Sequence, residues 1–148
     1  MKDEIVILIA EDDNGHFSLI KKNLERIGIN NPIIRFIDGQ ETLNFLFRKG
    51  NGLIRELDKG YLLLLDINMP KLNGVEVLKQ IKDEPELANV PVVMLTTSDD
   101  QAKADECREL GCTAYIVKPV EYGDFVSTIR SIGMFLSVVV MPEIAEVR

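Results

Sequence analysis

The chain has 148 residues, of which 46% are hydrophobic and 28% are charged, and its formal net charge is −7. This length suits a single domain over residues 1–148, because two hydrophobic cores would leave too few residues for either. The negative charge argues against nucleic-acid binding, since a phosphate backbone is held by clustered lysine and arginine. We expect a cytoplasmic protein outside the membrane, because its first residues resemble no secretory signal and no apolar run approaches the ~20 residues that span a bilayer.

The first quarter of the chain predicts a strand, a helix and a second strand. Residues 5–10 form a short apolar run, which is typical of a buried strand. The next apolar residues recur at three- and four-residue steps, as on one face of a helix: Phe17, Ile20, Leu24 and Ile27. Asp13 and Asn14 are placed to cap the start of this helix. Residues 33–37 then predict the second strand.

The middle of the chain predicts a second helix and a third strand. Asp38 and Glu41 have the spacing of a capping box, and the apolar positions that follow are Leu43, Leu46 and Phe47. Residues 48–60 form a polar connection that contains glycine. Residues 61–66 are the most apolar run and predict a buried strand, which is followed by a turn-rich loop at residues 69–74.

Two further strands and three helices are expected in the remainder. Asn73 and Glu76 have capping-box spacing, and residues 91–96 and 114–117 predict the fourth and fifth strands. The inward positions of the last three helices are expected at Val75, Leu78 and Ile81, at Ala104, Cys107 and Leu110, and at Phe125, Ile129, Ile132 and Leu136. Five strands alternating with five helices predict an α/β fold, a doubly wound parallel sheet of the flavodoxin-like type with strand order 2-1-3-4-5.

Chemically capable residues end four of the five predicted strands. Glu11 and Asp12 follow the first strand, Asp66 ends the third, Thr96 ends the fourth and Lys118 follows the fifth. In an open parallel sheet, ligands bind in the crevice at the carboxyl ends of the strands. We therefore expect these side chains to converge on one site.

The composition of this expected site favours phosphoryl chemistry with a divalent cation. Neighbouring carboxylates repel unless a cation offsets their charge, and Mg²⁺ prefers hard oxygen ligands. An ionised aspartate such as Asp66 can attack phosphorus, and the ammonium of Lys118 can pair with phosphoryl oxygens. Taken singly, each residue also has a simpler interpretation: acids and Thr96 as caps, and Lys118 as a solvated surface lysine.

Four motifs together resemble the receiver domains of two-component response regulators. They are Ile-Leu-Ile-Ala-Glu-Asp-Asp at residues 7–13, Leu-Leu-Asp-Ile-Asn-Met-Pro at 64–70 with Asn-Gly at 73–74, Pro-Val-Val-Met-Leu-Thr-Thr-Ser at 91–98 and Tyr-Ile-Val-Lys-Pro at 115–119. The resemblance covers nearly the whole chain. It implies that Asp66 is the phosphoacceptor and that Mg²⁺ is held by Glu11, Asp12, Asp66 and the backbone carbonyl of Asn68.

The resemblance also implies how the phosphoryl group is sensed. Thr96 matches the switch hydroxyl of the family, and Tyr115 matches the aromatic residue that turns inward when that hydroxyl moves. Lys118 matches the lysine that pairs with the phosphoryl group, and the Lys118–Pro119 peptide is implied to be cis. A simpler interpretation of Tyr115, as a half-buried aromatic near the sheet edge, is compatible with this role.

The expected partners follow from a finer resemblance to stand-alone regulators partnered with phytochrome-type histidine kinases. The similar features are Leu-Thr-Thr-Ser at residues 95–98, the long connection at 48–60 and the hydrophobic tail. The resemblance implies a sensor histidine kinase as phosphodonor, while the downstream protein target is unknown. The C-terminal tail, residues 138–148, either folds back on the last helix or extends onto a partner, and we expect a homodimer through the last strand, last helix and tail.

Two other functions remain open from the sequence. A Mg²⁺-dependent phosphohydrolase would share the aspartyl nucleophile, but such enzymes often place a second acid two residues later, where this chain has Asn68. A flavodoxin-like binding module would need hydroxyls and amides where the first strand is followed by acids. His16, the only histidine, is expected to be a solvated helix residue, and Cys107 and Cys112 are expected to be reduced. The favoured interpretation is a phosphorylation switch and not an enzyme.

Overall fold

The computed structural model describes residues 5–96, 101–117 and 123–128, and its centre is a five-stranded parallel sheet. The strand order is β2-β1-β3-β4-β5, as predicted. The strands are β1 (Ile5–Ala10), β2 (Ile33–Phe36), β3 (Gly60–Asp66), β4 (Val92–Thr96) and β5 (Ala114–Val117). The flavodoxin-like strand order predicted from the sequence is therefore confirmed.

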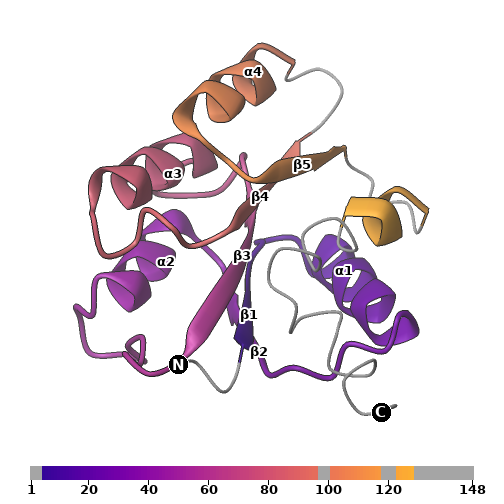
Figure 1. The fold of residues 1–148 in the computed structure, drawn as a ribbon, viewed down its shortest axis with the longest axis horizontal. Helices are drawn as coiled ribbons and strands as arrows, with labels where there is room; N and C mark the ends of the chain where they lie inside the picture. Colours follow the sequence, from indigo (N-terminus) through magenta and orange to yellow (C-terminus); the bar gives the residue numbers. More distant parts are fainter. Residues whose placement is uncertain (1–4, 97–100, 118–122, 129–148) are drawn as a thin grey trace.

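Helices cover both faces of the sheet (Figure 1). They are α1 (Asn14–Arg26), α2 (Gly39–Leu46), α3 (Gly74–Asp83) and α4 (Gln101–Leu110), and residues 123–128 are also helical. Figure 1 shows α2, α3 and α4 on one side of the strands, and α1 with the helical segment 123–128 on the other. Five helices on two faces confirm the doubly wound arrangement.

Two hydrophobic clusters hold these layers together. Alternate residues of the central strands point to opposite faces of the sheet, so β1 contributes to both clusters. The cluster on the first face joins β1 and β3 to α2, α3 and α4 and includes Leu8, Leu63, Leu46, Leu78 and Cys107. The cluster on the second face joins them to α1 and residues 123–128 and includes Ile7, Leu64, Ile20, Leu24 and Phe125. Because β1 and β3 are buried on both faces, their carboxyl ends are held rigidly.

Three helices start at the caps that the sequence predicts. The side chain of Asp13 accepts a hydrogen bond from the His16 N–H at 2.8 Å, and Asp38 accepts one from the Glu41 N–H at 2.7 Å. Asn73 accepts one from the Glu76 N–H at 2.9 Å. Each bond satisfies a main-chain donor that has no partner within the helix. The caps on α1 and α3 fix the two connections that leave β1 and β3.

The predicted starts of β3 and β4 shift by one residue, to Gly60 and Val92, and two further details differ. β2 ends at Phe36 instead of Ile37, because the Ile37 N–H bonds to the carboxylate of Glu41 at 3.1 Å, in the capping region of α2, and its side chain is exposed. Phe45 was not predicted in the core, yet it is buried between the rings of Phe36 and Tyr61. Within the described part of the chain, no helix is long and apolar enough to cross a membrane.

Candidate functional site

The register of the sheet brings the carboxyl ends of β1 and β3 to the same level. Ala10, the last residue of β1, pairs with Leu65 of β3. The residues that follow, Glu11 and Asp66, therefore lie beside each other at the edge of the sheet. This is also where the chain order reverses, since β2 lies on one side of β1 and β3 on the other. Such a switch point is the usual ligand-binding position in an open α/β sheet.

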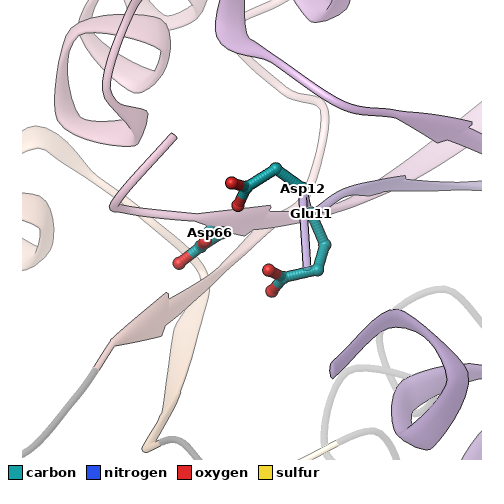
Figure 2. Close-up of side chains that lie close together, drawn as sticks. All are labelled: Glu11, Asp12 and Asp66. Atoms are coloured by element: carbon teal, nitrogen blue, oxygen red, sulfur yellow. The ribbon is translucent and has the colours of Figure 1, made fainter. Parts of the chain in front are cut away.

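Three carboxyl groups meet at this edge (Figure 2). One oxygen from each of Glu11, Asp12 and Asp66 lies within 4.8 Å of the others. Glu11 and Asp66 are 0% and 1% exposed, whereas Asp12 is exposed. The structure thus brings together three of the four metal-ligating residues predicted from the sequence.

Main-chain donors orient the two buried carboxylates. The Asp13 N–H donates to Oε2 of Glu11 at 3.1 Å, and the Asn68 N–H donates to Oδ1 of Asp66 at 3.3 Å. His16 lies nearby, with its Nδ1 3.9 Å from Oε2 of Glu11. Its side chain is 37% exposed, so the expected solvated helix residue also faces the acids.

The donor set fits a small hard cation. All three groups offer carboxylate oxygen, which Mg²⁺ prefers, and they cluster closely enough to share one ion. The exposure of Asp12 leaves part of the site open to water, in keeping with the tendency of Mg²⁺ to retain several waters. Three neighbouring negative charges, two of them buried, also favour binding of a cation that offsets their repulsion.

Comparison with known proteins identifies the family of this fold and site. The sequence model of the response regulator receiver domain matches residues 7–130, well over half of the chain. The chain belongs to the response regulator receiver domains. This membership confirms the resemblance drawn from the four sequence motifs.

Relatives of this receiver domain include regulators linked to several systems. It is 36% identical over 132 residues to the probable methanogenesis regulatory protein FilR2 of Methanothrix harundinacea, covering 88% of this chain and 83% of that relative. It is 33% identical over 138 residues to the response regulator Rcp1 of Synechocystis, covering 93% and 92% of the two chains. The solved bacteriophytochrome response regulator RtBRR is 41% identical with a TM-score of 0.78, over 86% of this chain and 77% of that one. The similarity to phytochrome-linked regulators is therefore also confirmed.

The structure places some of the remaining predicted site residues of the receiver domain, whereas others lie outside the residues that it describes. Thr96 ends β4, one residue beyond Leu95, which pairs with Asp66. Lys118 and Pro119, including the predicted cis peptide, lie outside the described residues. Asn68 follows Asp66 by two residues, and its N–H contacts the carboxylate, but the role of its carbonyl stays a prediction.

Tyr115 of the receiver domain is half-buried and contacts α4. It pairs in register with Met94 of β4 and packs against the first hydrophobic cluster. The guanidinium carbon of Arg108 lies 4.8 Å from the centre of its ring. Both interpretations of Tyr115, as a half-buried aromatic and as a switch residue, are compatible with this position.

Two residues support the site although the sequence analysis assigned them no role in it. Gly74 begins α3 directly against Asp66, where a Cβ atom would overlap the Asp66 carbonyl, and its N–H bonds to the Ile67 carbonyl at 2.7 Å. Arg35 of β2 donates from Nε to the Glu11 carbonyl at 3.0 Å. The signal for Arg35 was present in the sequence, because it is the one charged residue in the strand Ile-Ile-Arg-Phe.

Proposed function

We propose that this receiver domain accepts a phosphoryl group on Asp66 from a histidine of a partner sensor kinase, in a Mg²⁺-dependent reaction. The observation that carries the proposal is the position of Asp66: its carboxylate ends β3 beside the acidic pair Glu11 and Asp12. Rcp1, one of the relatives, has been solved in a Mn²⁺-bound form, which supports a divalent cation in this family. Receiver domains are signalling switches and are not classed as enzymes.

The chemistry assigns separate tasks to the three acids. An oxygen of Asp66 attacks the phosphorus atom, a P–O bond forms, the P–N bond to the kinase histidine breaks, and its electron pair returns to the imidazole. The Asn68 N–H holds the other carboxylate oxygen, which limits rotation of the nucleophile. Glu11 and Asp12, with Asp66 and the Asn68 carbonyl, would hold Mg²⁺. When bound, the ion would supply positive charge against the phosphoryl oxygens.

Signal output is proposed to pass from β4 to the surface formed by α4 and β5. Thr96 would contact the phosphoryl oxygens, Lys118 would pair with them, and Tyr115 would change position in response. The contact of Arg108 with Tyr115 supports this route, since it joins the proposed switch residue to α4. The output is then a protein contact made by an altered surface.

The proposed partners follow from the relatives. RtBRR is a bacteriophytochrome response regulator, so a phytochrome-type histidine kinase is our preferred phosphodonor. We further propose that residues 1–148 act as one receiver domain in the cytoplasm, without nucleic acid or membrane, and that residues 138–148 serve a dimer or partner contact.

The test is covalent labelling with phosphoramidate, a small donor whose P–N bond resembles that of phosphohistidine. The full chain is incubated with phosphoramidate and Mg²⁺, and mass spectrometry locates the adduct. We expect a single acid-labile phosphoryl group on Asp66, its loss in Asp66→Asn, and its retention in the control Asp58→Asn, which changes an exposed aspartate outside the site.

Three results would contradict the proposal. Labelling that persists in Asp66→Asn would assign the wrong acceptor, and labelling that is unaffected by a chelator would remove the role of Mg²⁺. Rapid release of inorganic phosphate over many turnovers would instead favour the phosphohydrolase alternative.

A further inference from the structure

Arg35 is a cation in an otherwise apolar edge strand. Its side chain lies on the face of the sheet that is covered by α1, where the guanidinium carbon is 4.5 Å from the centre of the Phe17 ring. From this position Nε donates to the main-chain carbonyl of Glu11 at 3.0 Å. A single side chain thus joins β2, the end of β1 and the first turns of α1.

The Glu11 carbonyl belongs to the peptide bond that links Glu11 to Asp12, two of the site acids. The N–H of Glu11 donates to the Phe36 carbonyl at 3.0 Å, and the carbonyl of Glu11 accepts the bond from Arg35. Two residues of β2 therefore hold the main chain of Glu11 on both sides. The direction of that carbonyl sets where the chain goes at Asp12, which is exposed. Asp13 then caps α1, the helix on which Phe17 lies.

We propose that Arg35 is a positioning residue for the divalent-cation site. It holds the Glu11–Asp12 peptide in the orientation that points both carboxylates toward Asp66, with Phe17 fixing the plane of the guanidinium. The inference rests on the proposed function, because the cation it serves is the Mg²⁺ of phosphoryl transfer.

Because Arg35 is charged, the direction of the change in cation affinity distinguishes an electrostatic effect from a positioning effect. Arg35 bonds to the main chain of Glu11, one of the site acids, so its positive charge opposes the binding of another cation. On electrostatic grounds alone, removal of this charge would tighten cation binding. Removal of a positioning contact has the opposite effect, because the loop must then be ordered when the ion binds. A weaker affinity in variants without the guanidinium therefore reports positioning.

The experiment measures Mn²⁺ binding to the full chain by electron paramagnetic resonance, without a phosphodonor. Arg35→Met keeps a long apolar side chain over Phe17 but removes the donor, and we expect it to raise the Kd for Mn²⁺ by ~10-fold. Arg35→Lys keeps a charge and a donor but lacks the planar guanidinium, and we expect it to raise the Kd for Mn²⁺ by ~3-fold.

Asn31→Ala is the matched control. Asn31 Nδ2 donates to the Ile5 carbonyl at 2.8 Å, the same kind of side-chain bond at the opposite end of β1. We expect this variant to lower the melting temperature without changing the Kd for Mn²⁺. Should Arg35→Met fail to fold, Arg35→Lys still tests the positioning contact, because it keeps the positive charge and removes only the planar guanidinium.

The outcomes separate this inference from the proposed function. An unchanged or lower Kd in the Arg35 variants, or an equal loss in Asn31→Ala, would overturn the inference alone, provided that Asp12→Asn abolishes Mn²⁺ binding. Mn²⁺ binding that survives Asp12→Asn would place the ion elsewhere and overturn the proposed function together with the inference.

Discussion

The burial of Glu11 and Asp66 explains how the site is prepared before any ligand arrives. Ionised carboxylates removed from water cost free energy unless hydrogen bonds or a cation compensate. The N–H groups of Asp13 and Asn68 supply part of that compensation and also fix the carboxylate orientations. At the scale of single residues, the site therefore combines an oriented carboxylate at Asp66 with a cluster of acids whose charge a cation can neutralise.

The two cysteines give a prediction at the same scale. Cys107 is fully buried, and burial, assisted by the nearby Cys112 and Glu106, raises its pKa from 9.0 to about 11. Because the thiolate is the reactive form, we expect iodoacetamide at pH 8 to modify the half-buried Cys112 before Cys107. Peptide mass spectrometry of the native protein, with a urea-unfolded sample as control, measures both rates.

The raised pKa also predicts a pH dependence for Cys107. A folded-state pKa above the unfolded value favours the native state while the thiol is protonated. This contribution to stability is fully present below pH 9.0 and is lost as the pH rises toward 11. Urea unfolding at pH 8 and at pH 10 should show a smaller loss in Cys107→Ala than in the unchanged protein. An equal loss would argue against the shift.

At the scale of elements, the connection from β3 to α3 is held by close backbone contact. Gly74, the first residue of α3, lies against the Asp66 carbonyl, and Gly39, the first residue of α2, lies against the Leu72 carbonyl. Lys71 between them adopts a φ of 69°, and its ammonium is 3.5 Å from Asp38. The helix starts thus support the loop that follows the proposed phosphoacceptor.

We expect Gly74→Ala to disturb this support. The added Cβ overlaps the Asp66 carbonyl, so α3 or the end of β3 must shift, at a cost of ~1–3 kcal/mol in the free energy of unfolding. Urea denaturation measures the loss, and phosphoramidate labelling should slow as the Asp66 carboxylate is displaced.

Gly52→Ala is the control for this variant, because nothing lies within 4 Å of a Cβ atom there. Its stability should stay within ~0.5 kcal/mol of the unchanged protein. Equal losses of stability in the two variants would mean that the contact between Gly74 and the Asp66 carbonyl does not stabilise the fold.

At the scale of the whole molecule, we expect a homodimer that forms through the last strand, the last helix and the tail. Val117, at the end of the edge strand β5, is a 45% exposed apolar residue on that face. Light scattering should give twice the monomer mass. Val139→Asp, within the tail, should reduce the measured mass to that of the monomer. Leu53→Asp, at an exposed position of the 48–60 connection, should leave it unchanged.

A monomer mass that is independent of concentration, with and without phosphorylation, would contradict the homodimer. Retention of the dimer in Val139→Asp would instead exclude the tail from the interface.

Local patterns in the sequence determined the element order, the helix caps at Asp13, Asp38 and Asn73, and the residue types at the strand ends. These features could be predicted because hydrophobic periodicity and capping depend on residues only a few positions apart. The parallel arrangement of the strands then predicted that Glu11, Asp12 and Asp66 would converge.

Only the tertiary structure decided how the site is supported. The contacts of Arg35 with Glu11, of Gly74 with Asp66 and of Arg108 with Tyr115 depend on strand register and helix packing. Periodicity shows which face of an element is buried, but it does not show which side chain from another element reaches a given carbonyl. That choice follows from the close packing of the whole domain, in which each element is positioned by all of its neighbours.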